Sequence, residues 1–446
     1  MTVTETANTN RVIVLDIVGL QPQHLSPATT PHLSALSGDN MASLRPPFPA
    51  VTVPSQTTLA TGRSPAAHGD VANGSYDRES DTVTFWDRDR GERDRLWETA
   101  SEAGLQTGVL FFQHLKGTTA DVALTPSPIE DENNDLVEMN CWSNPDGFYE
   151  DLVEEYGHFP LHNYWGPLAG REGTEWILTA ASEAIERYDP DLLWIYIPHL
   201  DYVGLREGPG SAFQSELEVV DALVGNFIED LHDDRWQETT TAVVSEYGFY
   251  SVDRPLFPNR TLKDAGLLSV TDTGDVDLSN SQAFALVDHQ IAHVYADRDD
   301  IPVVRSALQS ISGIAEIRKP TPGDYHPNTG DLVLVAERDA WFQYYWWHDE
   351  KTAPPYASDV DIHAKPGFDP CELFLGDAAP ISLDSTQVGG SHGRTDTEGH
   401  GIFGLGGPAA PDIDNGQVDA RAVAPTIAEI LDIRDVDASF EGSSVV

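Results

Sequence analysis

The chain has 446 residues, of which 73 are acidic and 26 are basic, so its formal charge is −47. Such a field repels phosphates except at a local cation, which argues against nucleic acid as a partner. Two cysteines exclude a disulfide framework, and no apolar run reaches the length of a membrane span. We therefore expect a cytoplasmic protein without a membrane partner. The self-repulsion needs screening by salt, which predicts the cytoplasm of a high-salt (halophilic) organism.

The first part of the chain alternates apolar strands with short helices. The stretch at 11–20 predicts a short, continuously apolar strand that ends in Asp16, and a helix is expected at 31–36. An amphipathic helix at 94–104 and an apolar strand at 107–112 follow. This alternation predicts an α/β fold, with a mostly parallel sheet and helices on both faces.

The stretch at 48–69, FPAVTVPSQTTLATGRSPAAHG, gathers hydroxyl side chains at the start of a predicted helix. Pro54 suits the first helical turn, where its missing N–H costs nothing. The unbonded N–H groups of that turn and the helix dipole would seat an anion, with Thr52 against a bound phosphate. The alternative is an ordinary N-capped helix after a Pro-rich loop.

An irregular, aromatic and Pro-rich stretch at 117–170 is interpreted as an excursion over one edge of the sheet that lines the substrate site. The alternation then resumes with a helix, a strand, a second helix and a second strand, at 175–188, 191–198, 211–233 and 240–245.

Three predicted strands end at or just before a carboxylate. The three carboxylates are those of Asp16, Asp201 and Glu246. Because open α/β sheets bind ligands at the carboxyl ends of their strands, this convergence predicts a metal site. The alternative for Asp16 is a cap on the following turn.

The later sequence changes in character and predicts a small inserted α+β cap. It comprises an apolar strand at 284–296, a helix at 303–312 and a strand at 331–336, and the aromatic run at 341–348 packs it against the core. A last core strand at 402–405 and a closing helix at 424–431 complete the chain. The predicted core therefore spans 10–270 and 380–435, with the cap at 271–379.

The order of these motifs resembles the alkaline phosphatase superfamily. Asp16 follows a first strand, Thr52 lies in FPAVTVPSQ, TGRSPAAHG comes next, S-E-Y-G follows a later strand, and G-S-H-G comes late. Within the superfamily the closest likeness is to type I phosphodiesterases and nucleotide pyrophosphatases. The resemblance implies an alkaline phosphatase-like core and a Thr nucleophile that bridges two divalent ions, usually zinc, with manganese as an alternative.

The resemblance carries over residue by residue. Thr52 matches the nucleophile, and Asp16 matches the Asp that shares the second metal with it. Ser55 falls where pyrophosphatases carry an Asn that binds phosphoryl oxygens. Asp201 and His392 match the Asp and the late His of the first metal.

Two positions depart from the family pattern. The family has a His where this chain has Leu205, and Asp-His where it has Glu246-Tyr247. Glu246 can serve as an oxygen ligand, whereas Leu205 cannot bind a metal and Tyr247 is a poor substitute for imidazole. Asp361 and His363, in an alternating stretch, would project on one face and replace the lost ligands, with a general acid as the alternative role of His363.

Other candidates remain open. His289, with Asp288, is a second candidate replacement ligand, and the alternative for His289 and His293 is a hydrogen-bonded core or cap histidine. Lys365 and Arg394 would neutralise a substrate phosphate, with surface ion pairs as the alternative. His68 and His199 are interpreted as structural.

The expected function is metal-dependent hydrolysis of phosphodiester or pyrophosphate bonds in a phosphorylated small molecule. Alternatives on the same fold are a phosphomonoesterase, a phosphonate hydrolase or a phosphomutase. A further alternative is a catalytically altered relative that binds a phosphorylated ligand without turnover. The sequence does not choose an oligomeric state.

Overall fold

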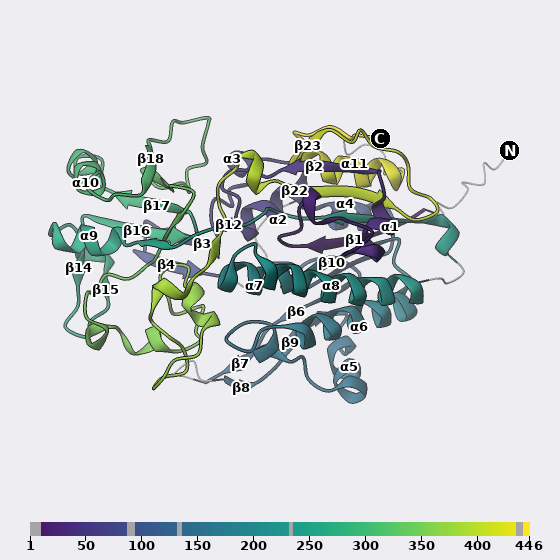
Figure 1. Ribbon diagram of the computed structural model, residues 1–446, viewed down its shortest axis with the longest axis horizontal. Helices are drawn as coiled ribbons and strands as arrows, with labels where there is room; N and C mark the ends of the chain where they lie inside the picture. Colours follow the sequence, from purple (N-terminus) through teal and green to yellow (C-terminus); the bar gives the residue numbers. More distant parts are fainter. Residues whose placement is uncertain (1–9, 87–93, 132–135, 232–234, 434–439) are drawn as a thin grey trace.

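A computed structural model describes residues 10–86, 94–131, 136–231, 235–433 and 440–446. Its centre is a nine-stranded sheet (Figure 1). The strand order is β23 (Gln417–Asp419), β2 (Met41–Arg45), β22 (Gly401–Gly406), β11 (Thr239–Val244), β1 (Arg11–Ile17), β10 (Leu192–Ile197), β5 (Thr107–Leu110), β6 (Val122–Pro126) and β9 (Cys141–Asn144).

The middle of this sheet is parallel. β11, β1, β10, β5 and β6 run the same way, whereas β22 and β9 pair antiparallel at either side. Parallel strands need crossover helices, which cover both faces and make the strands apolar throughout. The predicted α/β fold is confirmed.

Helices pack on both faces, and β1 shows why. Its alternate residues Ile13 and Leu15 belong to one apolar cluster, and Val12 and Val14 to another. Residues of α1 (Pro31–Ser37), α5 (Phe148–Tyr156), α6 (Arg171–Tyr188), α7 (His199–Glu207) and α8 (Ser211–Asp230) join the first cluster. Residues of α2 (Thr52–Thr61), α4 (Leu96–Glu102) and α11 (Val423–Ile430) join the second. The predicted end of the 211–233 helix, and the predicted core end at 435, lie outside the described residues.

A second, antiparallel sheet lies at the left of Figure 1. Its order is β16 (Ala283–Asp288), β17 (Ile291–Ala296), β19 (Leu332–Ala336) and β18 (Ile314–Arg318), and α10 (Ile301–Leu308) belongs to the same unit. The sheet falls within the predicted cap range. α9 (Pro258–Asp264) precedes that range yet packs on this sheet, because the Asn259 side chain donates to Ala285 O and accepts from Ala285 N. The domain boundaries stay a prediction.

Two details of the predicted elements were wrong. The stretch at 284–296 is a β16–β17 hairpin rather than one strand, since the chain reverses at His289 and Gln290. The irregular stretch at 117–170 contributes β6 and β9 to the central sheet, as well as α5.

The remaining elements of the described residues are short. They are α3 (Pro65–His68) and the paired strands β3 (Gly74–Asp77) with β4 (Thr82–Phe85), β7 (Ile129–Glu130) with β8 (Leu136–Glu138), β12 (Tyr250–Ser251) with β21 (Gly390–Ser391), β13 (Arg254–Leu256) with β20 (Ala340–Phe342), and β14 (Ser269–Val270) with β15 (Val276–Asp277). No helix within the described ranges combines the length and apolar character needed to cross a bilayer.

Candidate active site

Three buried carboxylates gather at the carboxyl ends of neighbouring parallel strands. Asp16 is the penultimate residue of β1, Asp201 lies in the first turn of α7 after β10, and Glu246 follows β11. Burial and then the charge of Asp16 raise the pKa of Glu246 well above its usual value, and Asp201 adds to the effect. The structure thus brings together the three carboxylates that the sequence singled out.

Few neighbouring groups offset the cost of burying the charges of these carboxylates. Burial raises the pKa of Asp16 to about 8, against the weaker opposing effect of a hydrogen bond from the Trp194 indole, 3.4 Å away. Burial likewise raises the pKa of Asp201 to about 7, opposed by the side chain of Tyr247. A group of buried carboxylates without positive partners is costly and calls for a bound cation.

Thr52 is the first residue of α2, and its hydroxyl lies 2.9 Å from the Tyr247 hydroxyl. Burial and the charges of Asp201 and Glu246 raise the pKa of Tyr247 well above its usual value, so the phenol keeps its proton. The Tyr247 ring stacks on His392, with 3.7 Å between ring centroids. Sequence reasoning counted Tyr247 as a lost ligand and missed its contact with Thr52, because no local pattern pairs residues 195 positions apart.

His392 presents one ring nitrogen to this cluster. Its Nδ1 lies 2.8 Å from Ala50 O, a carbonyl that can only accept, so Nδ1 carries the proton. Burial, and then His289, lower the pKa of the imidazole well below its usual value. The neutral ring therefore leaves Nε2 as an acceptor, 3.9 Å from Asp201 Oδ1.

Several buried polar atoms here have no hydrogen-bond partner among the described residues. They are Asp16 Oδ1, Ser55 Oγ, Asp201 Oδ1, both carboxylate oxygens of Glu246, His289 Nε2 and His392 Nε2. Within the described ranges, no three His, Cys, Asp or Glu side chains already stand in a metal-binding arrangement. The unpartnered atoms are nevertheless oxygens and imidazole nitrogens, which suit divalent zinc or manganese.

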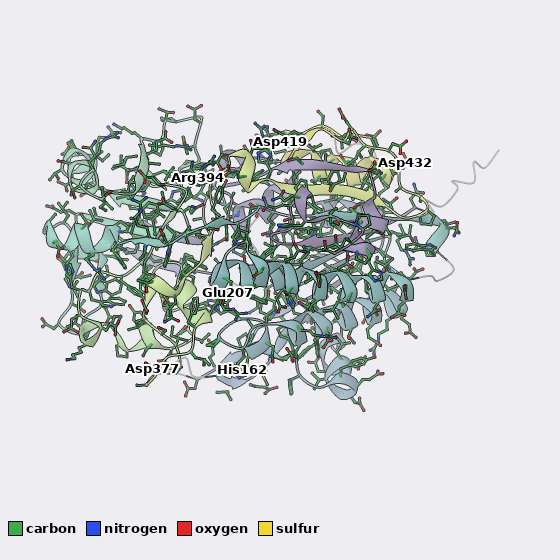
Figure 2. All side chains as sticks on the ribbon, viewed as in Figure 1. His162, Glu207, Asp377, Arg394, Asp419 and Asp432 are labelled. Carbon is green, nitrogen blue, oxygen red and sulfur yellow. The ribbon has the colours of Figure 1, made fainter. Side chains whose placement is uncertain are left out.

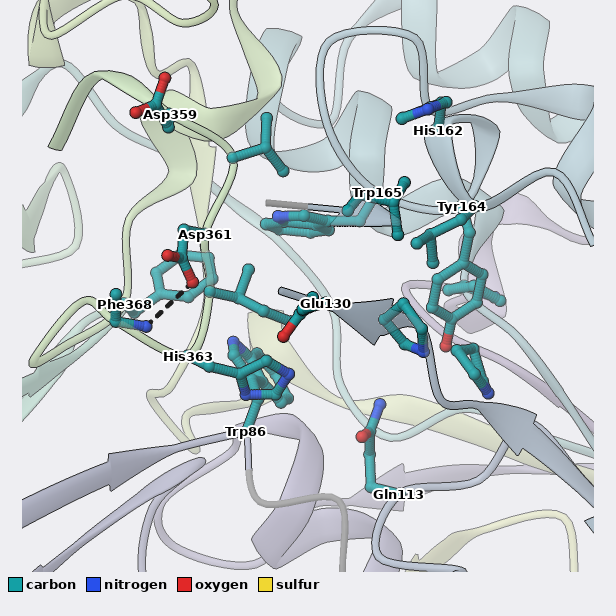
Figure 3. A pocket seen from close by; sticks show the side chains of 18 of the residues that line it. Trp86, Gln113, Glu130, His162, Tyr164, Trp165, Asp359, Asp361, His363 and Phe368 are labelled. Atoms are coloured by element: carbon teal, nitrogen blue, oxygen red, sulfur yellow. Dashed lines mark hydrogen bonds between the residues drawn. The ribbon is translucent and has the colours of Figure 1, made fainter. Parts of the chain in front are cut away.

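A pocket of about 840 Å³ opens beside Thr52 and Asp201 (Figure 3). Its aromatic lining comes from several distant segments and comprises Trp86, Tyr164, Trp165, Tyr196, Tyr202, Tyr356 and Phe368. The irregular stretch at 117–170 supplies Tyr164 and Trp165 to this pocket, and its predicted place at a substrate site stays a prediction. Flat apolar rings of this kind can hold an aromatic group of a ligand.

Asp361 and His363 both line this pocket, but not as the sequence predicted. The chain forms a turn there rather than a strand, and Asp361 Oδ1 accepts from Ala364 N at 3.1 Å. His363 Nδ1 lies 3.2 Å from Phe85 O. The extended conformation implied by the alternation was wrong, although both residues line one pocket, and their role as metal ligands stays a prediction.

The two predicted phosphate-binding cations have other partners. Lys365 is fully buried and pairs with Asp369 at 3.0 Å and Glu372 at 2.7 Å. Arg394, labelled in Figure 2, pairs with Asp396 at 2.9 Å and donates to a backbone carbonyl. Neither lines the pocket. The structure therefore argues against substrate binding by either residue, because their charges serve internal ion pairs.

The first turn of α2 offers fewer backbone donors than the sequence predicted. Val53 N donates to Asn73 Oδ1 at 2.8 Å, Pro54 has no N–H, and Ser55 N bonds to Val51 O. Ser55 Oγ is buried without a partner. An anion seat made of several first-turn amides is thus a wrong prediction, whereas the Ser55 hydroxyl stays a candidate.

Two histidines interpreted as structural are bonded at both ring nitrogens. His68 contacts Thr58 Oγ1 and Asp70 N. His199 contacts Thr174 Oγ1 and Glu216 Oε2, the latter at 2.7 Å. Neither His68 nor His199 has a nitrogen left for a metal.

Comparison with known proteins identifies the family. The family model for type I phosphodiesterase / nucleotide pyrophosphatase matches residues 12–369. The chain belongs to this family. The phosphodiesterase family lies in the alkaline phosphatase superfamily, so the resemblance drawn from the sequence is confirmed.

Two curated members of the family match about half of the chain. An uncharacterized pyrophosphatase/phosphodiesterase of Schizosaccharomyces pombe is 25% identical over 230 residues, which cover 49% of this chain and 40% of the relative. Ectonucleotide pyrophosphatase/phosphodiesterase family member 3 of Bos taurus is 26% identical over 236 residues, which cover 49% of this chain and 22% of the relative. The matched part is therefore less than half of each relative.

Solved structures of murine ectonucleotide pyrophosphatase/phosphodiesterase 5 share the fold. One has a TM-score of 0.62 at 17% identity and covers 97% of both chains. Another, an inactive form in complex with AMP, has a TM-score of 0.61 at 17% identity and covers 98% of this chain and 97% of that one.

Proposed function

We propose that the protein hydrolyses phosphodiester or pyrophosphate bonds with Thr52 as the nucleophile. The observation that carries the proposal is the place of the Thr52 hydroxyl. It lines an aromatic pocket together with Asp201 and contacts Tyr247, a phenol that the buried carboxylates Asp201 and Glu246 also influence. A phosphoryl centre in that pocket would lie between a hydroxyl and a set of groups suited to cations.

Two divalent cations suit the available ligands. Asp16, Glu246 and Thr52 would hold one, and Asp201 and His392 the other, with zinc proposed and manganese as the alternative. When bound, such cations lower the pKa of a hydroxyl and stabilise charge on a leaving oxygen. Asp361 and His363 would complete the ligand set from the pocket wall.

The reaction divides into two displacements at phosphorus. The Thr52 oxygen forms a bond to phosphorus as the bond to the leaving oxygen breaks, so the Thr52 proton leaves and the departing oxygen gains one. Water then adds to the phosphothreonine and releases the phosphate product, which restores the hydroxyl. Tyr247, which keeps its proton, would orient the Thr52 oxygen.

Further support comes from the relatives and the pocket. The curated relatives carry pyrophosphatase/phosphodiesterase names, and a solved relative binds AMP. The aromatic lining of this pocket matches a substrate with a nucleobase or another aromatic group.

One observation favours a second candidate, namely ligand binding without turnover. Leu205 stands where the family has a metal-binding His, and it is fully buried in an apolar cluster. The Thr52 oxygen is already hydrogen-bonded to the Tyr247 hydroxyl. Metal content and turnover separate the two functions.

The test measures bound metal by elemental analysis, together with hydrolysis of bis-p-nitrophenyl and p-nitrophenyl phosphate, in molar salt without chelator. We expect about two ions per chain and faster hydrolysis of the diester. Thr52→Ala should lower kcat by roughly 10³-fold or more, whereas the control Thr61→Ala, at the far end of the same helix, should not.

A protein without metal, and without turnover after zinc or manganese is added, would support the binding function instead. Faster hydrolysis of the monoester would favour the phosphomonoesterase alternative.

A further inference from the structure

We propose that His289, oriented by Asp288, is a ligand of the cation held by Asp201 and His392. It would supply the imidazole that Leu205 cannot. The inference rests on the proposed function and adds a residue from the second sheet to the site.

His289 lies at the tip of the β16–β17 hairpin, and its ring packs against His392 and Phe368. It is 1% exposed and has a φ of +59°, an uncommon conformation for a residue other than glycine. Its carbonyl accepts from Phe342 N at 2.7 Å, and the adjacent Gln290 N donates to His392 O at 2.9 Å. These bonds hold the tip against the segment that carries His392.

Asp288 orients the His289 ring through a hydrogen bond at Nδ1. Nδ1 lies 2.8 Å from Asp288 Oδ1, and Asp288 also accepts from Asn73 N at 2.7 Å and Asn73 Nδ2 at 3.0 Å. A carboxylate that accepts a hydrogen bond from Nδ1–H keeps the proton on Nδ1. The lone pair of the ring is then on Nε2, which points away from the carboxylate. This carboxylate–histidine pairing is the arrangement that supports metal-binding imidazoles.

The unpartnered His289 Nε2 has neighbours of the right kind. The ring centroids of His289 and His392 are 3.8 Å apart, and the Nε2 atoms of both rings lack hydrogen-bond partners among the described residues. Asp201 Oδ1, also without a partner, lies 3.9 Å from His392 Nε2. His289 and Asp201 line the same pocket. Two imidazoles and a carboxylate are a common zinc ligand set.

A second buried histidine of the same hairpin provides the contrast. His293 Nε2 lies 2.9 Å from Val71 O, and its Nδ1 accepts from Gly330 N at 3.2 Å. Burial in this hairpin is therefore compatible with complete hydrogen bonding. His289 differs because one nitrogen is left for another partner.

Packing contacts also restrain the His289 ring. Phe368 lies against the ring, with 3.5 Å between centroids, while Asp288 holds its other edge. The ring is thus held between an apolar partner, a carboxylate and His392.

The experiment titrates metal-free protein, in molar salt, with Co²⁺ by absorption spectroscopy and with Zn²⁺ by calorimetry. The variants are His289→Gln and Asp288→Asn, with His293→Gln as the matched control and circular dichroism as the check on folding. We expect His289→Gln to lose the second of about two binding events and to alter the Co²⁺ absorption bands. Asp288→Asn should weaken that event by about 10- to 100-fold.

Wild-type stoichiometry, affinity and Co²⁺ spectrum in folded His289→Gln would overturn the inference, and would leave the proposed function standing if Thr52→Ala is still inactive. If His289→Gln does not fold, Asp288→Asn decides by the same affinity criterion. Wild-type protein that binds no metal would instead remove the proposed function and this inference together.

Discussion

Tyr247→Phe tests the contact between the phenol and the proposed nucleophile. The substitution removes only the hydroxyl, because a phenyl ring can keep the stacking on His392. Thr52 Oγ1 then loses its 2.9 Å partner in a fully buried place. Hydrogen bonds of this kind are worth about 1 to 3 kcal/mol when a buried group is left unsatisfied.

That range predicts a decrease in kcat of roughly 5- to 150-fold, since about 1.4 kcal/mol corresponds to tenfold. KM should change little, because the phenol orients the nucleophile rather than holding the substrate. The assay is steady-state hydrolysis of bis-p-nitrophenyl phosphate in molar salt, with bound metal measured in parallel.

Tyr202→Phe is the matched control, since Tyr202 is buried and lines the same pocket but makes no contact with Thr52 among the described hydrogen bonds. If kcat of Tyr247→Phe stays within twofold of wild type, the phenol does not orient Thr52 and the reasoning is refuted.

Three further outcomes follow from the charges of the chain, two from buried groups and one from the net charge. When a chelator removes metal, the carboxyl groups of Asp16 (pKa about 8) and Asp201 (pKa about 7) keep their protons in the folded protein. In the unfolded chain the same groups lose their protons near the ordinary pKa of 3.8. Folded protein then binds more protons, so the thermal midpoint should fall as the pH rises from about 4 to about 8; a flat profile would contradict this. Lys365→Met leaves two buried carboxylates without their cation and should lower the free energy of unfolding by about 3 to 5 kcal/mol. Urea titration measures this change. An unchanged urea midpoint would show that the ion pairs of Lys365 are not buried in solution. Lower KCl should reduce the thermal midpoint, because the charge of −47 is then less screened; a midpoint independent of salt would argue against a high-salt cytoplasm.

The sequence predicted four of the central parallel strands, β1, β5, β10 and β11, because each is a short apolar run, whereas β6 was missed inside the irregular stretch at 117–170. Carboxylates at the ends of such runs could be placed together by topology alone, and Asp16, Asp201 and Glu246 do gather in the structure. The assignment of the high-salt cytoplasm rests on charge alone and stays a prediction.

The failures came from local turns without a clear sequence signal and, at His289, from contacts with distant segments. Lys365 looked available because its partners Asp369 and Glu372 are brought to it only by the 3₁₀ turn that follows. The reversal at His289 was missed because Asp-His-Gln carries no Gly or Pro turn signal, and its positive φ is held by tertiary hydrogen bonds. Strand alternation at 360–363 was overridden by a turn in which Asp361 accepts from Ala364 N.

The hairpin tip also joins the two sheets mechanically. Asp288 is bonded to Asn73, Gln290 N is bonded to His392 O, and the next residue of that segment, Gly393, accepts from Ala50 N beside α2. The smaller sheet is therefore bonded to the segments beside α2, and Asn73 in turn accepts from Val53 N in α2, so this sheet does not rest on a linker alone. Both units should unfold in one cooperative transition, and excision of the smaller sheet should disorder the start of α2 instead of leaving a simplified enzyme.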